Sequence, residues 1–221
     1  MRPNQQLTAD KIVAIARELI QETGDFDLPM RELAARAQVS LRTPYQIFGS
    51  KSGVINAILM RNQKLFRTLS TRLSSVDEVE NIFDRVRLGI GFFADDQPFF
   101  RALFRATQGY DGRASDPASD NLRSFQILCM RASRAGLIVP DADIAIVGET
   151  LSDIFAANVR RWARGDFDIA LVDLKIGFGF ASVLSSVTEG AVSDRLRLRM
   201  LDFQRRIQAF ETAASRIEAA A

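Results

Sequence analysis

Two short helical patterns separated by a tight turn, within residues 29–48, constrain the fold of this chain more than any other feature. The first pattern carries apolar residues at helical spacing, namely Met30, Leu33, Ala34 and Ala37. The turn Gln38-Val39-Ser40 follows, and the second pattern carries polar and aromatic residues and ends before Gly49. This arrangement predicts a helix-turn-helix, a motif whose second helix lies against base edges in the major groove of DNA.

The ends of the N-terminal helices are predicted from residues that typically cap helices. Gly24 is expected to end the first helix. The residues expected to cap the first four helices are, in order, Thr8, Asp27, Ser40 and Ser50. Three short helices packed on the start of a long fourth helix predict a compact head of about 70 residues.

Beyond Ser75 the sequence predicts only further helices, so the expected fold is all-α. They span about 77–94, 97–108, 119–135, 141–164, 168–189 and 192–218, with a loop from Tyr110 to Pro117. No alternating run typical of strands occurs between turns. We expect two domains: residues 1–52 as a helix-turn-helix DNA-binding domain, linked by helix 50–73, and residues 53–221 as a helical domain.

The N-terminal third of the chain is basic, although the net charge of the whole chain is only +2. Residues 1–73 contain eleven Lys and Arg against six Asp and Glu, and no acidic residue occurs between Glu32 and Asp77. The basic residues of this acid-free segment are Arg36, Arg42, Lys51, Arg61, Lys64, Arg67 and Arg72. Such a patch attracts phosphate, with an affinity that falls as salt rises. A solvated basic surface without a partner is the alternative.

Composition excludes several classes of active site. The chain has no histidine, which rules out Ser-His-Asp and Cys-His nucleophile systems and His-containing metal sites within it. Its single cysteine, Cys129, lies in an apolar helical pattern and is expected to be a buried core residue. We predict no catalytic residue, metal or cofactor. The N-terminus lacks a signal-like apolar run, and the longest apolar stretch, 176–187, is too short to span a bilayer, so we expect a cytoplasmic protein with no membrane partner.

Over about residues 8–60 the chain resembles the TetR family of bacterial transcriptional regulators. The matching motifs are Arg31-Glu32-Leu33-Ala34, Val39-Ser40 and Thr43-Pro44-Tyr45-Gln46-Ile47-Phe48-Gly49-Ser50-Lys51. The rest of the chain agrees with the family in the number and order of expected helices. The resemblance implies an N-terminal three-helix DNA-binding head and a larger C-terminal helical domain for ligand binding and dimerisation.

The resemblance also implies which residues meet DNA, because the third helix of the family enters the major groove. The implied contacts are Arg31, Leu41, Arg42, Thr43, Tyr45, Gln46 and Lys51. Arg42 suits guanine and Gln46 suits adenine, since each side chain can form two hydrogen bonds with that base. Tyr45 and Lys51 are expected to hold phosphate, which positions the protein without reading the sequence.

Three positions depart from the family pattern. Gln38 stands at a turn position where the family often has glycine, and a positive φ there costs a residue with a side chain roughly 1–2 kcal/mol. Pro44 replaces an aliphatic residue and puts the base register of relatives in doubt. Leu28-Pro29 replaces the hydroxyl residue that usually opens the second helix, which puts a phosphate contact from that side chain in doubt.

The resemblance implies a homodimer whose two heads read half-sites about 34–36 Å apart in a palindromic operator. We assign the dimer surface to the helices at 141–164 and 168–189. The small residues that would allow close helix approach are Gly177, Gly179, Ala181, Ser182 and Ser185. Packing of these residues within one chain is the alternative.

The last expected helix, 192–218, carries an apolar seam with 4-3 spacing, which is typical of helices that pack along a narrow stripe. The seam consists of Leu196, Met200, Phe203, Ile207, Phe210, Ala214 and Ile217. It can pack on its own subunit or against a partner chain, and we favour packing within the subunit.

The C-terminal half is rich in phenylalanine and could enclose a hydrophobic small molecule. The candidate ligand residues are Phe92, Phe99, Phe100, Phe104, Phe125, Phe155 and Asn158. Filling of the core is the alternative for each ring. The expected function is a transcriptional repressor that binds a double-stranded DNA operator as a homodimer and is released by an unidentified hydrophobic effector.

Two other classes of function compete with this expectation. A helical small-molecule-binding protein without specific DNA readout would retain the basic head but show no preference for a palindrome. An enzyme is disfavoured, because the sequence has no Gly-rich phosphate loop and no metal-ligand cluster. The remaining candidate for catalysis is the acidic pair Glu149 and Asp153. With Arg160, this pair is expected to form a solvent-exposed stripe of a helix.

Overall fold

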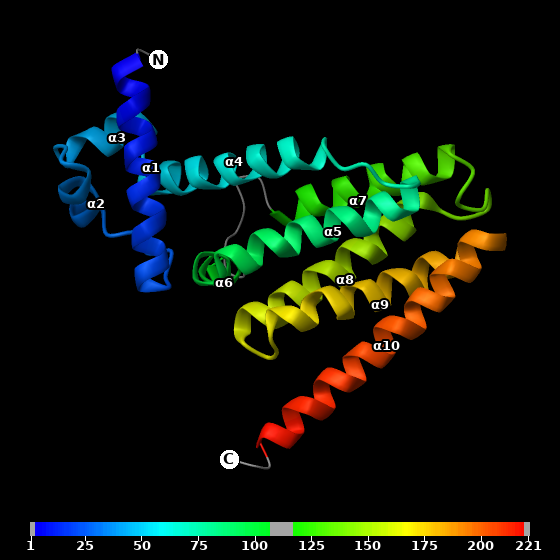
Figure 1. The fold of residues 1–221 in the computed structure, drawn as a ribbon. Helices are drawn as coiled ribbons and strands as arrows, with labels where there is room; N and C mark the ends of the chain where they lie inside the picture. Colours follow the sequence, from blue (N-terminus) through cyan, green and yellow to red (C-terminus); the bar gives the residue numbers. More distant parts are fainter. Residues whose placement is uncertain (1–2, 107–116, 219–221) are drawn as a thin grey trace. The chain divides into compact units, whose positions relative to one another are not determined.

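The structure is a computed structural model that describes residues 3–106 and 117–218. Within these ranges it holds ten α-helices and no strand, which confirms the all-α prediction. The chain divides into two compact units. Figure 1 colours the chain by residue number, so that the segments of each unit can be identified. Unit 1 comprises residues 1–72 and 95–114, and unit 2 comprises residues 73–94 and 115–221. The expected functional boundary at residue 52 stays a prediction.

Unit 1 is built on its first helix, α1, which packs against four others. The helices of this unit are α1 (Pro3–Thr23), α2 (Met30–Ala37), α3 (Arg42–Phe48), α4 (Lys51–Ser70) and α6 (Gln97–Ala106). The core stripe of α1 lies along one helix face and consists of the buried residues Ile12, Ala16, Leu19 and Ile20. In Figure 1, α2 and α3 lie beside α1 at the N-terminal end of α4. This arrangement is the predicted three-helix head.

The caps expected for the first two helices of unit 1 are wrong. Thr8 lies inside α1, where its hydroxyl donates to the Asn4 carbonyl at 2.9 Å, because the helix already begins at Pro3. Asp27 does not cap α2, since the residue before this helix is Pro29 and no side chain bonds to its first turn. Gly24 does end α1, with a φ of +65° that favours glycine.

The expected caps of the next two helices have opposite outcomes. Ser40 is not the cap of α3, because Leu41 precedes that helix and the Ser40 hydroxyl instead pairs with the Thr43 hydroxyl at 2.9 Å. Ser50 is the predicted cap of α4, and its hydroxyl accepts from the Gly53 N–H at 3.0 Å. The start of α4 directly after α3 is therefore fixed by a local hydrogen bond.

Unit 2 contains five helices that agree with the predicted ones to within a few residues at each described end. They are α5 (Glu78–Asp95), α7 (Pro117–Arg134), α8 (Ile144–Arg164), α9 (Ile169–Ser186) and α10 (Gly190–Glu218). α8 packs against α7 and α9, and α10 packs along α9 (Figure 1). Asp143 and Asp168 cap α8 and α9. Of the expected loop, Pro117 begins α7, and residues 110–116 lie outside the described residues.

Within the described ranges, α9 is the one helix long and apolar enough to cross a membrane by length and composition. It exceeds the expected apolar stretch 176–187, because it begins at Ile169 and also buries Leu171, Val172 and Leu174. α9 packs against α8 and α10, and it buries Ile176, Phe180 and Leu184 completely. Core helices of globular units have this same composition.

The small residues of α9 are used within the chain. A Cβ on Gly177 would overlap the Phe203 ring of α10, and a Cβ on Gly179 would lie 2.9 Å from Ile154 of α8. The hydroxyl of Ser182 donates to the Phe178 carbonyl at 2.8 Å. These contacts correspond to the alternative of packing within one chain. Because Gly177 and Gly179 pack against α10 and α8 of the same chain, these two glycines do not support the expected dimer surface.

The apolar seam of α10 begins within its own unit, as we favoured. Leu196 and Phe203 are buried, and α10 packs along α9. Met200, Ile207 and Phe210 are partly exposed. The side chains of Ala214 and Ile217 lie outside the described residues. The first half of the seam is therefore a core feature of unit 2.

Candidate nucleic-acid interface

One face of α3 is solvent-exposed and carries four of the predicted DNA contacts. Leu41 and Tyr45 are 44% and 42% exposed, and Arg42 and Gln46 are also exposed. Positions 41, 42, 45 and 46 share one side of a helix with 3.6 residues per turn. The structure therefore brings these four side chains together on a single exposed face of the helix.

The opposite face of α3 holds the helix in unit 1. Pro44 is buried and is the third residue of the helix, where the N–H that it lacks would have no partner within the helix. Ile47 and Phe48 are half-buried, and the Gly49 N–H donates to the Tyr45 carbonyl at 2.8 Å. Thr43, another predicted contact, is half-buried and pairs with Ser40. Thr43 thus stabilises the start of the helix in the structure.

The predicted cationic contacts differ in their availability. Arg31 and Arg42 are exposed, and neither forms an ion pair or a side-chain hydrogen bond within the described residues. Lys51 instead forms an ion pair with Asp27 of the loop before α2. A phosphate at Lys51 would have to compete with that carboxylate. The sequence gives no sign of this pair, because the partners are 24 residues apart.

Besides Lys51, two other basic residues of the acid-free segment form ion pairs with acidic residues from outside that segment. Arg36 donates to Glu22 at 2.7 Å and to Glu32 at 2.6 Å, and these carboxylates raise the pKa of the Arg36 guanidinium. Arg61 lies 3.8 Å from Asp10. Arg36, Lys51 and Arg61 of the acid-free segment are thus paired. The other cations of this segment, which form no ion pair among the described residues, are Arg42, Lys64, Arg67 and Arg72. The basic patch is thus smaller in the structure than the sequence predicts.

The turn between α2 and α3 requires a left-handed residue. Gln38 has φ 57° and ψ 43°, and it is the one residue other than glycine with a positive φ in the described ranges. Its N–H donates to the Ala35 carbonyl at 3.0 Å, and the Val39 N–H donates to the Ala34 carbonyl at 3.0 Å. These bonds close α2 and set where α3 begins. The predicted strain at Gln38 is therefore present.

The candidate ligand residues are divided between the two units. Phe99, Phe100 and Phe104 lie on α6 in unit 1, where Phe99 packs on Phe26 with ring centroids 5.7 Å apart and on Phe100 at 5.2 Å. Phe100 stacks on Phe104 at 6.3 Å. Phe99 and Phe100 are buried. These rings fill the core of unit 1, which is the alternative left open by the sequence.

The remaining ligand candidates lie in unit 2. Phe125 of α7 packs on Phe155 of α8 with centroids 5.7 Å apart and on Phe180 of α9 at 5.3 Å. Phe92 is half-buried on α5. The Asn158 amide donates to the Ile154 carbonyl of its own helix at 2.8 Å. Binding of a small molecule among these residues stays a prediction.

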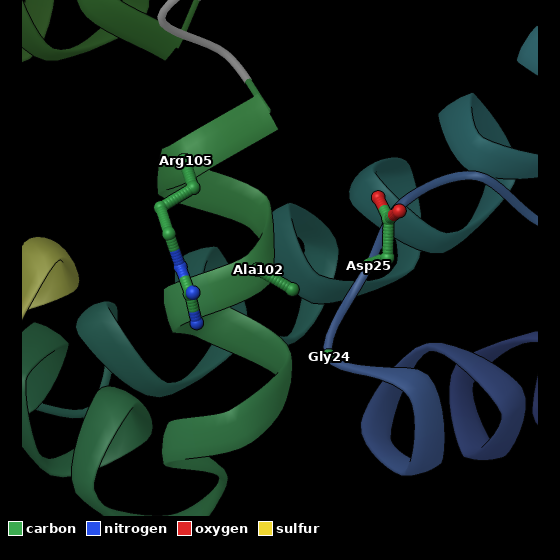
Figure 2. Close-up of a pocket in the computed structure, with 4 residues that line it drawn as sticks. All are labelled: Gly24, Asp25, Ala102 and Arg105. Atoms are coloured by element: carbon green, nitrogen blue, oxygen red, sulfur yellow. The ribbon is translucent and has the colours of Figure 1, made fainter.

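An open pocket of about 380 Å³ occurs in unit 1. It is lined by Gly24, Asp25, Ala102 and Arg105. Figure 2 shows Arg105 and Ala102 on α6, opposite the segment after α1 that carries Gly24 and Asp25. None of the predicted aromatic ligand residues lines this pocket. Elsewhere, Glu149, Asp153 and Arg160 are all exposed on α8, as expected for a solvated stripe.

The structure also shows a polar cluster that the sequence did not single out. Arg17 of α1 and Asp96 before α6 form an ion pair at 2.6 Å, and Asp96 is buried. The two residues are 79 positions apart, so no local spacing could have paired them. This contact places the start of α6 against α1, which also packs against α3 of the candidate interface, all within unit 1.

Solved structures of TetR-type regulators resemble this chain over most of its length. A TetR regulator from Streptomyces fradiae, TylP, has a TM-score of 0.65 with 20% identity, and the match covers 91% of this chain and 97% of that one. SmeT, the repressor of the Stenotrophomonas maltophilia multidrug efflux pump SmeDEF, has a TM-score of 0.68 with 18% identity, over 85% and 94%. A γ-butyrolactone receptor described as ArpA-like has a TM-score of 0.62 with 18% identity, over 92% and 98%.

No protein-family model and no curated protein matches the sequence. The structural likeness spans both units of the chain and nearly the full length of each solved structure. At identities of 18–20% it identifies the fold. The chain therefore has the fold of the TetR family of transcriptional regulators, with an N-terminal helix-turn-helix and a C-terminal helical part.

Proposed function

We propose that this protein is a DNA-binding transcriptional regulator of the TetR family, a repressor that acts in the cytoplasm. The observation that carries the proposal is the exposed face of α3, on which Arg42 and Gln46 form no side-chain hydrogen bond or ion pair within the described residues. Unengaged guanidinium and amide groups on one helix face match the donor and acceptor pattern of the major groove. The solved structures with the same fold include a repressor.

In this proposal α3 enters the major groove. Some side chains of the interface contact bases, and others contact phosphates. Arg42 donates two hydrogen bonds to a guanine, and Gln46 pairs with an adenine one helical turn further on. Arg31 contacts phosphate, and Lys51 exchanges Asp27 for phosphate when DNA arrives. Tyr45 places its ring against the backbone and its hydroxyl on a phosphate.

The proposed assembly is a homodimer that binds a palindromic operator. Two copies related by a two-fold axis present two α3 helices, which match half-sites about one helical turn apart. The proposed dimer surface is the side of α8 and α9 that faces away from the core of unit 2. Ile146 of α8, 61% exposed, supports this assignment, because a large apolar side chain gains from being covered. Light scattering after gel filtration at micromolar concentration measures the oligomeric state directly.

The proposed regulation is release from DNA by a small hydrophobic ligand bound in unit 2. The proposal is supported by a cluster of aromatic rings in unit 2, in which Phe93 and Phe125 contact Phe155, and Phe125 also contacts Phe180. Among the solved structures with this fold, two are described as structures of a γ-butyrolactone receptor. A ligand shifts the protein from mostly bound to mostly released only if it prefers one state by several kcal/mol.

Selection of bound duplexes from a random pool tests the proposal. We expect wild-type protein to select a palindrome, with an affinity that falls steeply as salt rises. Arg42→Ala and Gln46→Ala should each lose preference at particular bases, by about 1–3 kcal/mol. Arg31→Ala should weaken all sequences alike, because a phosphate contact carries no sequence information.

Arg134→Ala provides the matched control, since Arg134 is an exposed arginine on α7 of unit 2. This variant should select the same palindrome with the same affinity as wild type. Uniform weakening by Arg42→Ala would show that this residue holds phosphate rather than a base. Selection of no sequence at low salt would contradict DNA readout and favour a helical protein that binds small molecules only.

A further inference from the structure

The exposed face of α3, which comprises residues 41, 42, 45 and 46, is termed the reading face. It includes an apolar side chain, Leu41, whose exposed part has no role in hydrogen bonding or in core packing. Leu41 directly precedes α3, is 44% exposed and lies on the same helix side as Arg42 and Gln46. Its backbone is helical, with φ −54° and ψ −28°, so the first turn of the helix fixes its direction. Scattered exposed leucines are ordinary, and exposure alone therefore carries no meaning. The position of Leu41 among the base-reading residues is what gives it a consequence.

Leucine has no donor or acceptor, which limits what it can recognise in a major groove. Of the four bases, thymine alone presents a methyl group there, at C5. We infer that Leu41 is a specificity-determining residue, which recognises the C5 methyl group of a thymine near the guanine contacted by Arg42. The inference rests on the proposed function, and it adds the chemical identity of one operator base.

The arrangement of α3 supports Leu41 in this role. Pro44 is buried on the inward side, which anchors the first turn in the core of unit 1. The Thr43 N–H donates to the Ser40 carbonyl at 2.9 Å, and the hydroxyls of these two residues also pair. The residues around Leu41 are therefore held in place before DNA arrives. Burial of a preformed apolar contact requires little ordering of the protein.

Replacement of thymine by uracil isolates the proposed contact. Uracil keeps the Watson–Crick pairing and the O4 acceptor of thymine and lacks only the C5 methyl group. In the selected operator, each thymine is replaced by uracil in turn, symmetrically in both half-sites, and the dissociation constant is measured at fixed salt. For wild type we expect one position at which the affinity falls about fourfold per half-site, the effect of one buried methyl group.

The variant Leu41→Ala should bind the thymine operator about as weakly as wild type binds the uracil operator. At the sensitive position, this variant should lose nothing further when thymine is replaced. Leu41→Met keeps an apolar chain of similar volume and should restore the sensitivity. The matched control is Leu65→Ala, because Leu65 is a 50% exposed leucine on α4 that lies outside the reading face. It should respond to uracil as wild type does.

The outcomes distinguish failure of this inference from failure of the proposed function. Unchanged uracil sensitivity in Leu41→Ala would assign the methyl contact to another residue and overturn the inference, while the regulator remains. A selective protein with no uracil-sensitive position, or an operator without thymine, would place Leu41 against the sugar–phosphate backbone and overturn it as well. Absence of any selected duplex would refute the proposed function and the inference together. Circular dichroism spectra establish that each variant is folded.

Discussion

The carboxylate of Asp96 accepts hydrogen bonds from Nε and Nη2 of Arg17, at 3.0 and 2.6 Å. The Gln21 amide donates to the same carboxylate at 2.6 Å, and the Arg17 guanidinium lies 4.6 Å from the Phe99 ring centre. Arg17 also donates to Asn62 of α4 at 2.8 Å. A single buried carboxylate thus ties the start of α6 to α1 and, through Arg17, to α4.

Replacement of this carboxylate should destabilise unit 1. Asp96→Asn keeps the shape of the side chain but removes the charge that Arg17 pairs with, and it leaves a half-buried guanidinium without its counter-ion. We expect the free energy of unfolding to fall by about 2–3 kcal/mol. Urea denaturation followed by far-UV circular dichroism measures this change.

The neighbouring residue supplies a control for this prediction. Asp95 is exposed and has the same side chain, so Asp95→Asn should change stability by less than about 0.5 kcal/mol. Equal effects of the two substitutions would show that the Arg17–Asp96 pair contributes no more than a surface charge.

The strained turn after α2 should respond to glycine. Gln38 adopts a left-handed conformation that glycine reaches without steric cost. We expect Gln38→Gly to raise the free energy of unfolding by about 1 kcal/mol, which thermal denaturation can detect. Gln38→Ala retains a Cβ and should bring no such gain. A gain of equal size in both variants would locate the strain in the glutamine side chain instead of the backbone.

Local patterns predicted the helices well, and long-range contacts limited what else could be predicted. The Ser50 cap and the positive φ of Gln38 depend on residues within four positions, so the sequence contains their cause. The exposed face of α3 follows in the same way from helical spacing. The early start of α1 was missed, because Thr8 is a good cap residue and nothing in the sequence shows that the helix continues past it.

The sequence predicted the exposed face of α3 better than it predicted which basic residues are free of acidic partners. Asp27 reaches Lys51 and Glu22 reaches Arg36 only after folding, so the acid-free segment gains acidic neighbours that linear spacing cannot reveal. The candidate ligand residues illustrate the same limit. Phe99 and Phe125 look alike in the sequence but belong to different compact units.

A partly buried carboxylate in unit 2 should make stability depend on pH. Burial raises the pKa of Asp173 on α9, while Arg87 and Arg206 act in the opposite direction without cancelling it. The folded state therefore binds the proton more tightly than the unfolded state, and stability falls as pH rises from the unfolded pKa through the folded pKa. We expect Asp173→Asn, which is always neutral, to be more stable than wild type at pH 7.

The advantage of Asp173→Asn should shrink as pH falls toward the ordinary pKa of aspartate, where the wild-type carboxyl is also neutral. Urea denaturation at pH 7 and pH 4 tests this trend. Asp153→Asn is the control, since Asp153 is exposed on α8. A wild type that is more stable than Asp173→Asn at pH 7 would mean that the two arginines dominate over burial.

The contact between α3 and α4 should tolerate no side chain at Gly53. A Cβ on Gly53 would overlap the carbonyl oxygen of Phe48 and lie 2.9 Å from its carbonyl carbon, so backbone would have to move. We expect Gly53→Ala to destabilise unit 1 by about 1–3 kcal/mol and to weaken operator binding, because the end of α3 must shift.

Gly91, in α5, has open space around its Cβ position, and Gly91→Ala should instead stabilise the protein by about 0.5–1 kcal/mol. Thermal denaturation of both variants compares the two glycines directly, and a stabilised Gly53→Ala would show that the end of α3 adjusts without cost.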